Sequence, residues 1–277
     1  MTRLGRLRLL GAAALAAPMM PILSVPAIAA EPSVQLDPHI VRLPVVDGKG
    51  LRFTRLSTAD GLSLTWVEHI VADDRGFLWF GTGYGLDRYD GYKFKVFVHD
   101  PTQPNSIGGY SISALFKDRS GMLWVASNRF LDKFDPTTEK FTHYQLEPGG
   151  PAGTVVHISQ DHAGMLWLTS GTGLHRFDPK TGQIRHYRSG LSSNDVQWTG
   201  EDSLGTFWVG TSKGLDAFDR EAGKVTLHIS IERASKPAFH EDRSGTFWIY
   251  NQTGNGLATF ESPRRLTSRE STIFTSL

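Results

Sequence analysis

The sequence contains no cysteine, which excludes disulfide bonds, a thiolate metal site and a cysteine nucleophile. It also lacks an excess of one charge, with 29 Lys and Arg residues against 28 Asp and Glu residues. Three of the arginines lie in the first 30 residues, where no acidic residue occurs, so the rest of the chain is close to neutral. A nucleic-acid partner is therefore not expected, because binding a phosphate backbone requires a clear excess of positive charge.

Short catalytic and metal-binding motifs are missing as well. The ten histidines are scattered without the spacing of a zinc site, and no Walker A string occurs. The Asp-x-x-Gly runs lack the ligand alternation and the final Glu of an EF-hand. Residues 210–214 match the G-x-S-x-G string of serine hydrolases, but they lie in a repeated turn and not between a strand and a helix. We therefore expect no catalytic residue, no metal and no cofactor in this chain.

The first 30 residues have the pattern of a secretory signal peptide. Three arginines precede an apolar stretch from Leu9 to Met20, and Ala27-Ile28-Ala29 offers small residues for cleavage. The alternative is an uncleaved membrane anchor, but prolines interrupt the segment, and its apolar run is shorter than the ~20 residues that a span needs. We expect cleavage and export to the periplasm or the cell exterior, with residues 31–50 as an N-terminal linker.

The remaining chain repeats one tryptophan-centred unit five times. The tryptophans are Trp79, Trp124, Trp167, Trp208 and Trp248. In each copy an aspartate lies six residues before the tryptophan and a glycine three residues before it. Downstream, each copy has a leucine, two further residues, an aromatic residue and an acidic residue. Repeats of ~40–50 residues built from short strands are typical of a β-propeller.

Each copy is predicted to form a four-stranded blade. The Asp-x-x-Gly run is expected to be a tight turn, in which the aspartate accepts hydrogen bonds from backbone amides and the glycine takes a positive φ. The tryptophans are expected to pack between neighbouring blades, with an exposed platform for sugars as the alternative. Residues 51–56 align with the fourth strand of a preceding blade. The strands predicted within the copies are Trp66–Ala72, Phe77–Gly81, Leu86–Tyr89, Ile112–Lys117, Met122–Ala126, Phe141–Tyr144, Val155–Gln160 and Ile184–Tyr187.

The repeat resembles the two-component regulator propeller repeat, whose pattern is D-x-x-G-x-L-W-[IVF]-G-T-x-x-G-L-x-R-[FY]-D. Residues 73–90 match that pattern closely, residues 58–63 are similar to the family's opening segment, and the resemblance covers residues 51–261. It implies an all-β propeller of about five four-stranded blades. It also implies the extracytoplasmic sensor region of a hybrid two-component protein, a sensor histidine kinase or a diguanylate cyclase.

The sequence departs from that family in its length. Family members usually continue with a small β-sandwich, a transmembrane helix and a transmitter domain, whereas this sequence stops after five copies. The fourth strand of the fifth copy, Arg264–Ser268, lacks the expected aromatic residue, and residues 262–277 are predicted to be a loose tail. We expect a truncated chain that lacks C-terminal signalling domains. A self-contained five-bladed propeller is the alternative.

Candidate ligand-binding residues follow from what varies between the copies. Antiparallel strands place the repeated Asp-x-x-Gly turns at one end of every blade and the variable turns and loops at the other, where binding residues concentrate. Four positions before the aspartate, His69, His157 and Trp198 interrupt a column otherwise filled by alanine. These three are interpreted either as ordinary strand residues or as a lining for a small ligand. The candidates are His69, Trp66, Tyr84, Tyr110, Arg129, His157, Trp198, Lys213, Tyr250 and Asn251.

Three functions are compatible with this pattern. The first is an exported propeller that senses a small molecule or an oligosaccharide for a two-component pathway, without chemistry of its own and with a homodimer as the switching unit. The second is a propeller lyase similar to streptogramin lyase, which would need a base such as His157, or His69 with Glu68, and Mg²⁺. The third is a structural scaffold. We expect the first, with ligand binding but no turnover.

Overall fold

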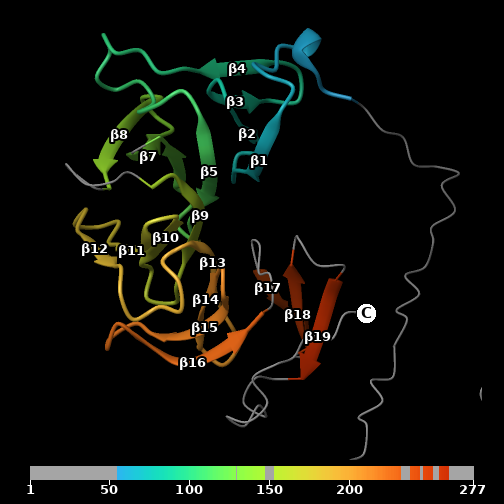
Figure 1. Ribbon diagram of the computed structural model, residues 1–277. Helices are drawn as coiled ribbons and strands as arrows, with labels where there is room; N and C mark the ends of the chain where they lie inside the picture. The colour runs from blue at the N-terminus through green and yellow to red at the C-terminus, as the bar shows by residue number, and fades with distance from the viewer. Residues whose placement is uncertain are drawn as a thin grey trace, which may run out of the picture. The chain divides into compact units, whose positions relative to one another are not determined.

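The computed structural model describes residues 55–128, 130–146, 153–231, 238–243, 246–251 and 256–261. The chain separates into two units, Met1–Phe53 and Thr54–Leu277, and all described residues belong to the second. The described part is all-β, and its strands form five antiparallel sheets in chain order, which we call blades 1 to 5 (Figure 1). A 3-10 helix, Thr58–Asp60, precedes blade 1. No helix in these ranges is long and apolar enough to cross a membrane.

The strands have the following bounds. Blade 1 contains β1 (Val67–Ala72), β2 (Leu78–Thr82), β3 (Leu86–Tyr89) and β4 (Phe94–Phe97). Blade 2 contains β5 (Ile112–Lys117), β6 (Leu123–Ser127), β7 (Phe130–Asp135) and β8 (Lys140–Gln145). Blade 3 contains β9 (Val155–Gln160), β10 (Leu166–Ser170), β11 (Gly173–Phe177) and β12 (Ile184–Tyr187). Blade 4 contains β13 (Val196–Glu201), β14 (Phe207–Thr211), β15 (Gly214–Asp219) and β16 (Lys224–Ser230). Blade 5 contains β17 (Ala238–Glu241), β18 (Thr246–Asn251) and β19 (Gly256–Glu261).

The predicted all-β propeller class is confirmed, and most predicted strands lie within one residue of the observed bounds. Blade 5 differs, because its described part has three strands in place of four. The fourth strand expected at Arg264–Ser268 and the tail lie outside the described residues, as does most of the strand expected at residues 51–56. The last two residues of that segment, Arg55 and Leu56, are not in a strand. The signal peptide and linker also lie outside the described residues, and the proposed domain boundaries stay predictions.

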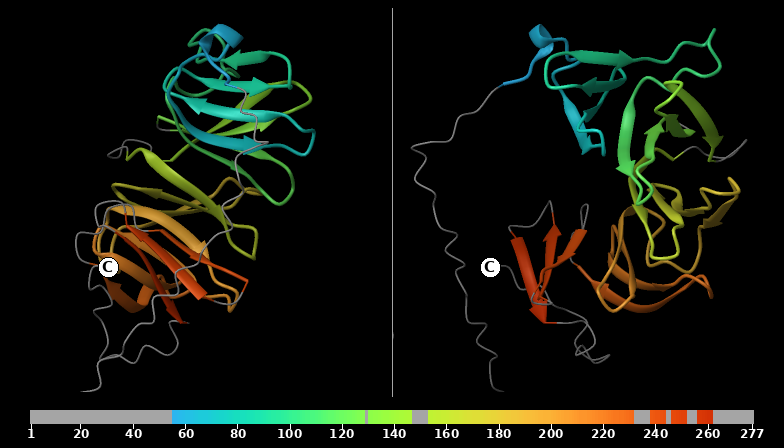
Figure 2. Two further views of the ribbon diagram at one scale, coloured as in Figure 1. Left: turned by 90° about the vertical axis from the view of Figure 1, so that its right-hand side faces the viewer. Right: turned by 180° about the vertical axis from the view of Figure 1, so that it is seen from behind.

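The first strand of each blade is the innermost. β1 lies beside β5, β5 beside β9, β9 beside β13, and β13 beside β17. The other strands of each blade follow outward in the order of the chain (Figures 1 and 2). This arrangement brings residues of the first strands close together although they lie about 40 residues apart in the sequence.

A hydrogen bond links the repeated aspartate to the repeated tryptophan in all five blades. The indole Nε1 donates to the aspartate Oδ2 over 2.8–3.0 Å, with the pairs Trp79–Asp73, Trp124–Asp118, Trp167–Asp161, Trp208–Asp202 and Trp248–Asp242. The other carboxylate oxygen accepts from the amide four residues on, as in Met122 N to Asp118 Oδ1 over 3.0 Å. The glycine at the turn has a positive φ, for example 83° at Gly121, as predicted. One carboxylate thus fixes both the turn and the ring.

The interfaces between blades bury these tryptophans under the next blade. In blade 2 the covering residues are Leu115, Leu123, Val125, Phe134 and Phe141, which are all buried and pack around Trp79 of blade 1. Blade 3 uses the same five positions around Trp124, and blade 4 uses four of them around Trp167. We call these five positions of a blade its leading face, and the opposite, tryptophan-bearing side its Trp face. The wedged tryptophans of blades 1 to 4 are at most 2% exposed, which confirms their expected role in the core.

Candidate functional site

The blades have two different ends, because their strands are antiparallel. The β1–β2 and β3–β4 turns, and their equivalents, lie at one end, which we call the Asp-turn end. The β2–β3 turns and the loops between blades lie at the other, which we call the variable end. Side chains that hold the blades together are not available to bind a ligand, so the two ends are compared by what their side chains contact.

The Asp-turn end is occupied by links between blades. The residue after the turn aspartate contacts the residue before the aspartate of the next blade at all four interfaces. The pairs are Asp74–Lys117 at 2.5 Å, Arg119 N–Gln160 at 2.9 Å, His162–Glu201 at 2.6 Å and Ser203 Oγ–Glu241 at 2.6 Å. The residue types differ, but each pair is complementary. Pairs near the surface contribute little energy singly, and these four link each blade to the next at the Asp-turn end.

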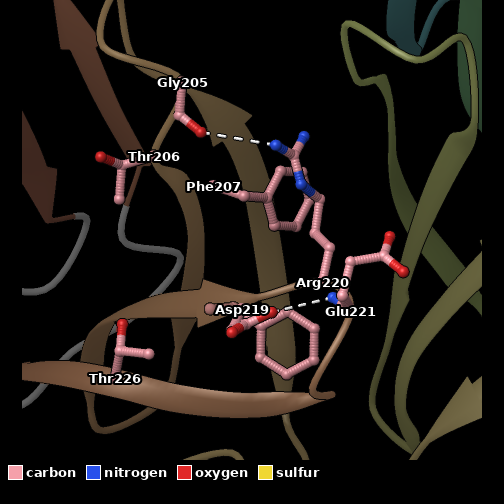
Figure 3. Close-up of a pocket in the computed structure, with 8 residues that line it drawn as sticks. Gly205, Thr206, Phe207, Asp219, Arg220, Glu221 and Thr226 are labelled. Carbon is pink, nitrogen blue, oxygen red and sulfur yellow. Dashed lines mark hydrogen bonds between the residues drawn. The ribbon is translucent and has the colours of Figure 1, made fainter.

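A shallow hollow of about 240 Å³ at this end belongs to the same network (Figure 3). Its basic residue, Arg220, lies with Nη1 2.8 Å from Glu201 Oε1 and with its guanidinium 5.4 Å from the Phe207 ring centre. Its Nη2 donates to the Gly205 carbonyl over 3.4 Å. Because the charge and the planar face of Arg220 are already engaged, the hollow is a structural feature of the blade interface.

The variable end carries a second repeated device, which fastens each incoming loop to its own blade. In three blades, a buried aspartate of the third strand accepts a hydrogen bond from a backbone amide in the loop that precedes the first strand of the same blade. The bonds are Ser63 N to Asp87 over 2.9 Å, Gly108 N to Asp132 over 2.9 Å and Ser192 N to Asp216 over 2.8 Å. In each case the two residues are 24 positions apart. We call each of these carboxylate–amide hydrogen bonds a latch, and the latches of blades 1 and 2 fix the loops that carry Trp66 and Tyr110.

Two of these carboxylates also bind a histidine of the fourth strand. His143 Nδ1 lies 2.6 Å from Asp132 Oδ1, and His228 Nδ1 lies 2.6 Å from Asp216 Oδ1. The hydrogen bond to Asp132 raises the pKa of His143, although burial opposes it. His143 is therefore charged over a wider pH range than a free histidine.

Blade 1 breaks this pairing. The residue opposite Asp87 in β4 is Val96, which cannot donate a hydrogen bond. Among the described residues no group reaches Asp87 Oδ1, which is buried. Burial raises the pKa of Asp87, and the two hydrogen bonds from Ser63 only partly offset this. The latch of blade 1 is thus the least satisfied of the three.

Three candidate residues come together on the inner strands. His69 of β1, His157 of β9 and Trp198 of β13 occupy equivalent positions, with the small Ala114 of β5 at the same position between the two histidines. The ring centres of His157 and Trp198 are 6.0 Å apart. His157 retains some exposed surface, but its Nδ1 is buried, and no described group forms a hydrogen bond with it. Burial, assisted by the charge of His69, lowers the pKa of His157 to about 4, so this ring is neutral at physiological pH.

Four further candidates project from the variable end. Trp66 is 70% exposed and directly precedes β1, and Tyr84 is 55% exposed in the β2–β3 turn. Tyr110 lies in the loop before β5, where its ring centre is 5.1 Å from that of His99. Lys213 is exposed in the β14–β15 turn. Trp66 and Tyr110 lie on loops that a buried carboxylate fixes, and exposed aromatic rings of this kind suit contact with a flat apolar surface or a sugar ring.

Three candidates cannot be placed fully. Arg129 lies outside the described residues. Tyr250 and Asn251 lie at the end of β18, but their side chains are outside what the structure describes. Sequence analysis missed the latch residues altogether. The signal was the recurrence of Asp or His directly after the repeated leucine, together with the 24-residue spacing to the loop.

Comparisons with known proteins agree with this fold. No family model matches the chain. The extracellular domain of a putative hybrid two-component system from B. thetaiotaomicron has a TM-score of 0.68 and 27% identity, covering 80% of this chain and 32% of that one. A virginiamycin B lyase from Staphylococcus aureus shares the fold, with a TM-score of 0.54 and 16% identity over 70% of this chain and 69% of the lyase. Histidine kinase P4 from Formosa agariphila is 40% identical over 55 residues, which are 20% of this chain and 4% of the kinase.

The protein is therefore a β-propeller that resembles the extracellular domain of a putative hybrid two-component system. The chain spans about a third of the two-component structure and a much smaller part of the kinase. The likeness to the lyase concerns the fold alone, because so few residues are identical.

Proposed function

We propose that this chain is an exported, ligand-sensing propeller segment of a two-component-type signalling protein, and that it binds its ligand without chemical turnover. The observation that carries the proposal is the match to an extracellular two-component domain over 80% of the chain at 27% identity. The ligand is a small molecule or an oligosaccharide. Transmission of the signal then requires output domains outside this chain.

The proposal is supported by a difference between the two ends of the blades in what their exposed side chains contact. At the Asp-turn end, the residues next to the turn aspartates are engaged in links between blades. At the variable end, Trp66 and Tyr110 are exposed on loops whose backbones are fixed by buried carboxylates, and Tyr84 is exposed in the β2–β3 turn. A rigid scaffold with exposed aromatic rings loses little conformational entropy on binding, which favours recognition of sugars or small ring systems.

Isothermal titration calorimetry against a panel of glycans and lactones tests this proposal, with chromatography of the same mixtures to detect products. The expected result is saturable binding without product. Tyr84→Ala and Tyr110→Ala should each weaken binding about 10-fold or more, because each removes an exposed aromatic contact. Tyr92→Ala is the matched control, since Tyr92 is 94% exposed but lies in the β3–β4 turn at the Asp-turn end. Loss of binding in the control, or turnover by the wild-type chain, would contradict the proposal.

The lyase hypothesis makes a distinct prediction for the same samples. A lyase would convert a lactone in the panel, and conversion would depend on a base on the inner strands. His157→Gln would abolish conversion by a lyase, whereas in a binding protein it would alter affinity only. The product analysis therefore separates the two functions without knowledge of the natural ligand.

A further inference from the structure

The loop between blades 1 and 2, residues 98–111, is fastened to blade 2 at two points by one pair of side chains. The Gly108 amide donates a hydrogen bond to Asp132 Oδ2 over 2.9 Å. Earlier in the loop, the Pro104 carbonyl oxygen lies 2.9 Å from Nε2 of His143. The other ring nitrogen, Nδ1 of His143, lies 2.6 Å from Asp132 Oδ1. The histidine therefore joins the loop to a buried carboxylate of β7.

These contacts need one more proton than a neutral histidine and an ionised aspartate hold together. The Pro104 carbonyl can only accept a hydrogen bond, so Nε2 of His143 carries a proton. At 2.6 Å a second proton lies between Nδ1 and Asp132 Oδ1, because neither atom would otherwise have a donor. The pair thus holds two protons in this arrangement, and the loss of one breaks a hydrogen bond.

The bond that breaks is the one to the loop. Asp132 is fully buried, so its Oδ1 cannot turn to water if the donor at Nδ1 is lost. Pro104 is exposed, and its carbonyl oxygen can accept from water instead. A neutral His143 therefore keeps its proton on Nδ1 and presents the lone pair of Nε2 to the Pro104 carbonyl. The contact then changes from an attraction to a repulsion.

Among the described residues, Asp132 is the one charged group that forms a hydrogen bond or an ion pair with His143. That hydrogen bond raises the pKa of His143 above its usual value of 6.5, although burial opposes it. The other charged or titratable groups on the elements beside His143 are Lys133 and Asp135 of β7, Glu139 of the following turn, Lys140 and Tyr144 of β8, His99 and Asp100 of the loop, and Arg88 and Lys95 on the Trp face of blade 1.

We propose that the Asp132–His143 pair is a proton-dependent tether, which holds the loop of residues 98–111 while the pair keeps both protons and releases it at Pro104 when one is lost. The tether is complete below pH 6.5 and is lost as the pH rises through the pKa of His143 in the fold. Because the loop carries Tyr110, a released loop has to be ordered again on binding, and ligand affinity should fall. This effect on affinity rests on the proposed function, whereas the tether does not.

Blade 4 contains the same pair without the tether. His228 pairs with Asp216 across β15 and β16, as His143 pairs with Asp132 across β7 and β8. Nδ1 of His228 lies 2.6 Å from Asp216 Oδ1, but no described group forms a hydrogen bond with its Nε2. Substitution of His228 is therefore a matched control, which removes a histidine bound to aspartate but no contact with a loop.

Hydrogen exchange of the ligand-free chain tests the tether at about pH 5.5 and about pH 8.5, on either side of the range in which histidines titrate. The protection factor, which corrects for the intrinsic rate at each pH, should be about 10-fold lower in residues 98–111 at the higher pH, as expected for the loss of one hydrogen bond from a charged donor. His143→Asn keeps a donor near the position of Nδ1 but ends short of Pro104. Its loop should show the low protection at both pH values, whereas His228→Asn should behave like the wild-type chain.

Equal protection of the loop at both pH values in the wild-type chain would overturn the proposal. The same pH dependence in His143→Asn would also overturn it, because another group such as His99 would then be responsible. The wild-type comparison needs no variant, so it decides the question even if circular dichroism shows that His143→Asn does not fold.

Titration of a panel ligand at the same two pH values tests the effect on affinity separately. Weaker binding at the higher pH in the wild-type chain, but not in His143→Asn, is the expected result. Equal affinity beside a pH-dependent loop would overturn the effect on binding alone. Absence of binding by every panel ligand would count against the proposed function, and the exchange measurement would still decide on the tether.

Discussion

Removing the carboxylate of Asp118 should destabilise the protein far more than removing a recurrent but exposed aspartate. Asp118 is buried and accepts hydrogen bonds from Trp124 Nε1 over 2.8 Å, from Met122 N over 3.0 Å and from the Ser120 hydroxyl over 2.6 Å. Trp124 is fully buried, so its indole nitrogen cannot turn to water when the acceptor is lost. An orphaned buried donor costs about 1–3 kcal/mol, and bonds to a charged group contribute about 1.5–3 kcal/mol each.

The turn amides lie near the surface and can recover part of their loss by binding water. We therefore expect Asp118→Ala to lower the free energy of unfolding by about 3–4 kcal/mol. Asp118→Asn keeps one acceptor oxygen, but its NH₂ group faces a hydrogen-bond donor. We expect this variant to lower the free energy of unfolding by about 2 kcal/mol. The matched control is Asp135→Ala: Asp135 is exposed and accepts from Thr137 N and the Thr138 hydroxyl, and its loss should cost less than about 1 kcal/mol.

Urea unfolding followed by circular dichroism measures these differences, provided that the slope of the free energy of unfolding against urea concentration is the same for each variant. A double-mutant cycle with Trp124→Phe isolates the indole bond, with an expected coupling energy of about 1–2 kcal/mol. The reasoning is refuted if Asp118→Ala and Asp135→Ala destabilise the protein equally, or if the cycle shows no coupling.

Three further predictions concern single buried groups. The pKa of His157 is about 4 in the folded chain and about 6.5 in the unfolded chain, so the unfolded state takes up the proton first as the pH falls. The free energy of unfolding should therefore decrease by up to ~3 kcal/mol between pH 6.5 and pH 4. His157→Gln should make the free energy of unfolding less dependent on pH over this range. Val96→His should give Asp87 Oδ1 a donor and raise the free energy of unfolding by about 1–2 kcal/mol in a urea titration, and no gain would show that this oxygen is already satisfied by water. Gly200→Ala places a methyl group in the Trp198 ring and should cost about 1–3 kcal/mol while weakening ligand binding, and unchanged values for both would exclude a tight contact there.

The repeated parts of the fold could be predicted from the sequence because they recur. Five aligned copies of the aspartate, glycine and tryptophan columns predicted the strands, the Asp-x-x-Gly turn and the burial of tryptophan. The aspartate–indole bond was not predicted, although the constant spacing of six residues was visible. The reason for that spacing becomes visible in the structure, where the pairing of β1 with β2 brings the carboxylate of the turn to the edge of the indole ring.

The site could be predicted only in outline. Sequence analysis located the variable end, but the strand register was needed to show that Asp87 faces Val96. The interblade links at the Asp-turn end were also invisible, because their residue types change from one interface to the next while each pair stays complementary. Complementarity between positions about 40 residues apart appears only when the blades are stacked.

Hydrogen exchange with and without a bound panel ligand tests most directly the central claim that the variable end recognises and the Asp-turn end supports. The account predicts added protection in residues 57–66, 98–111 and 188–195 and along the first strands, with unchanged exchange at the Asp-x-x-Gly turns. Protection confined to those turns and to the hollow around Arg220 would contradict it.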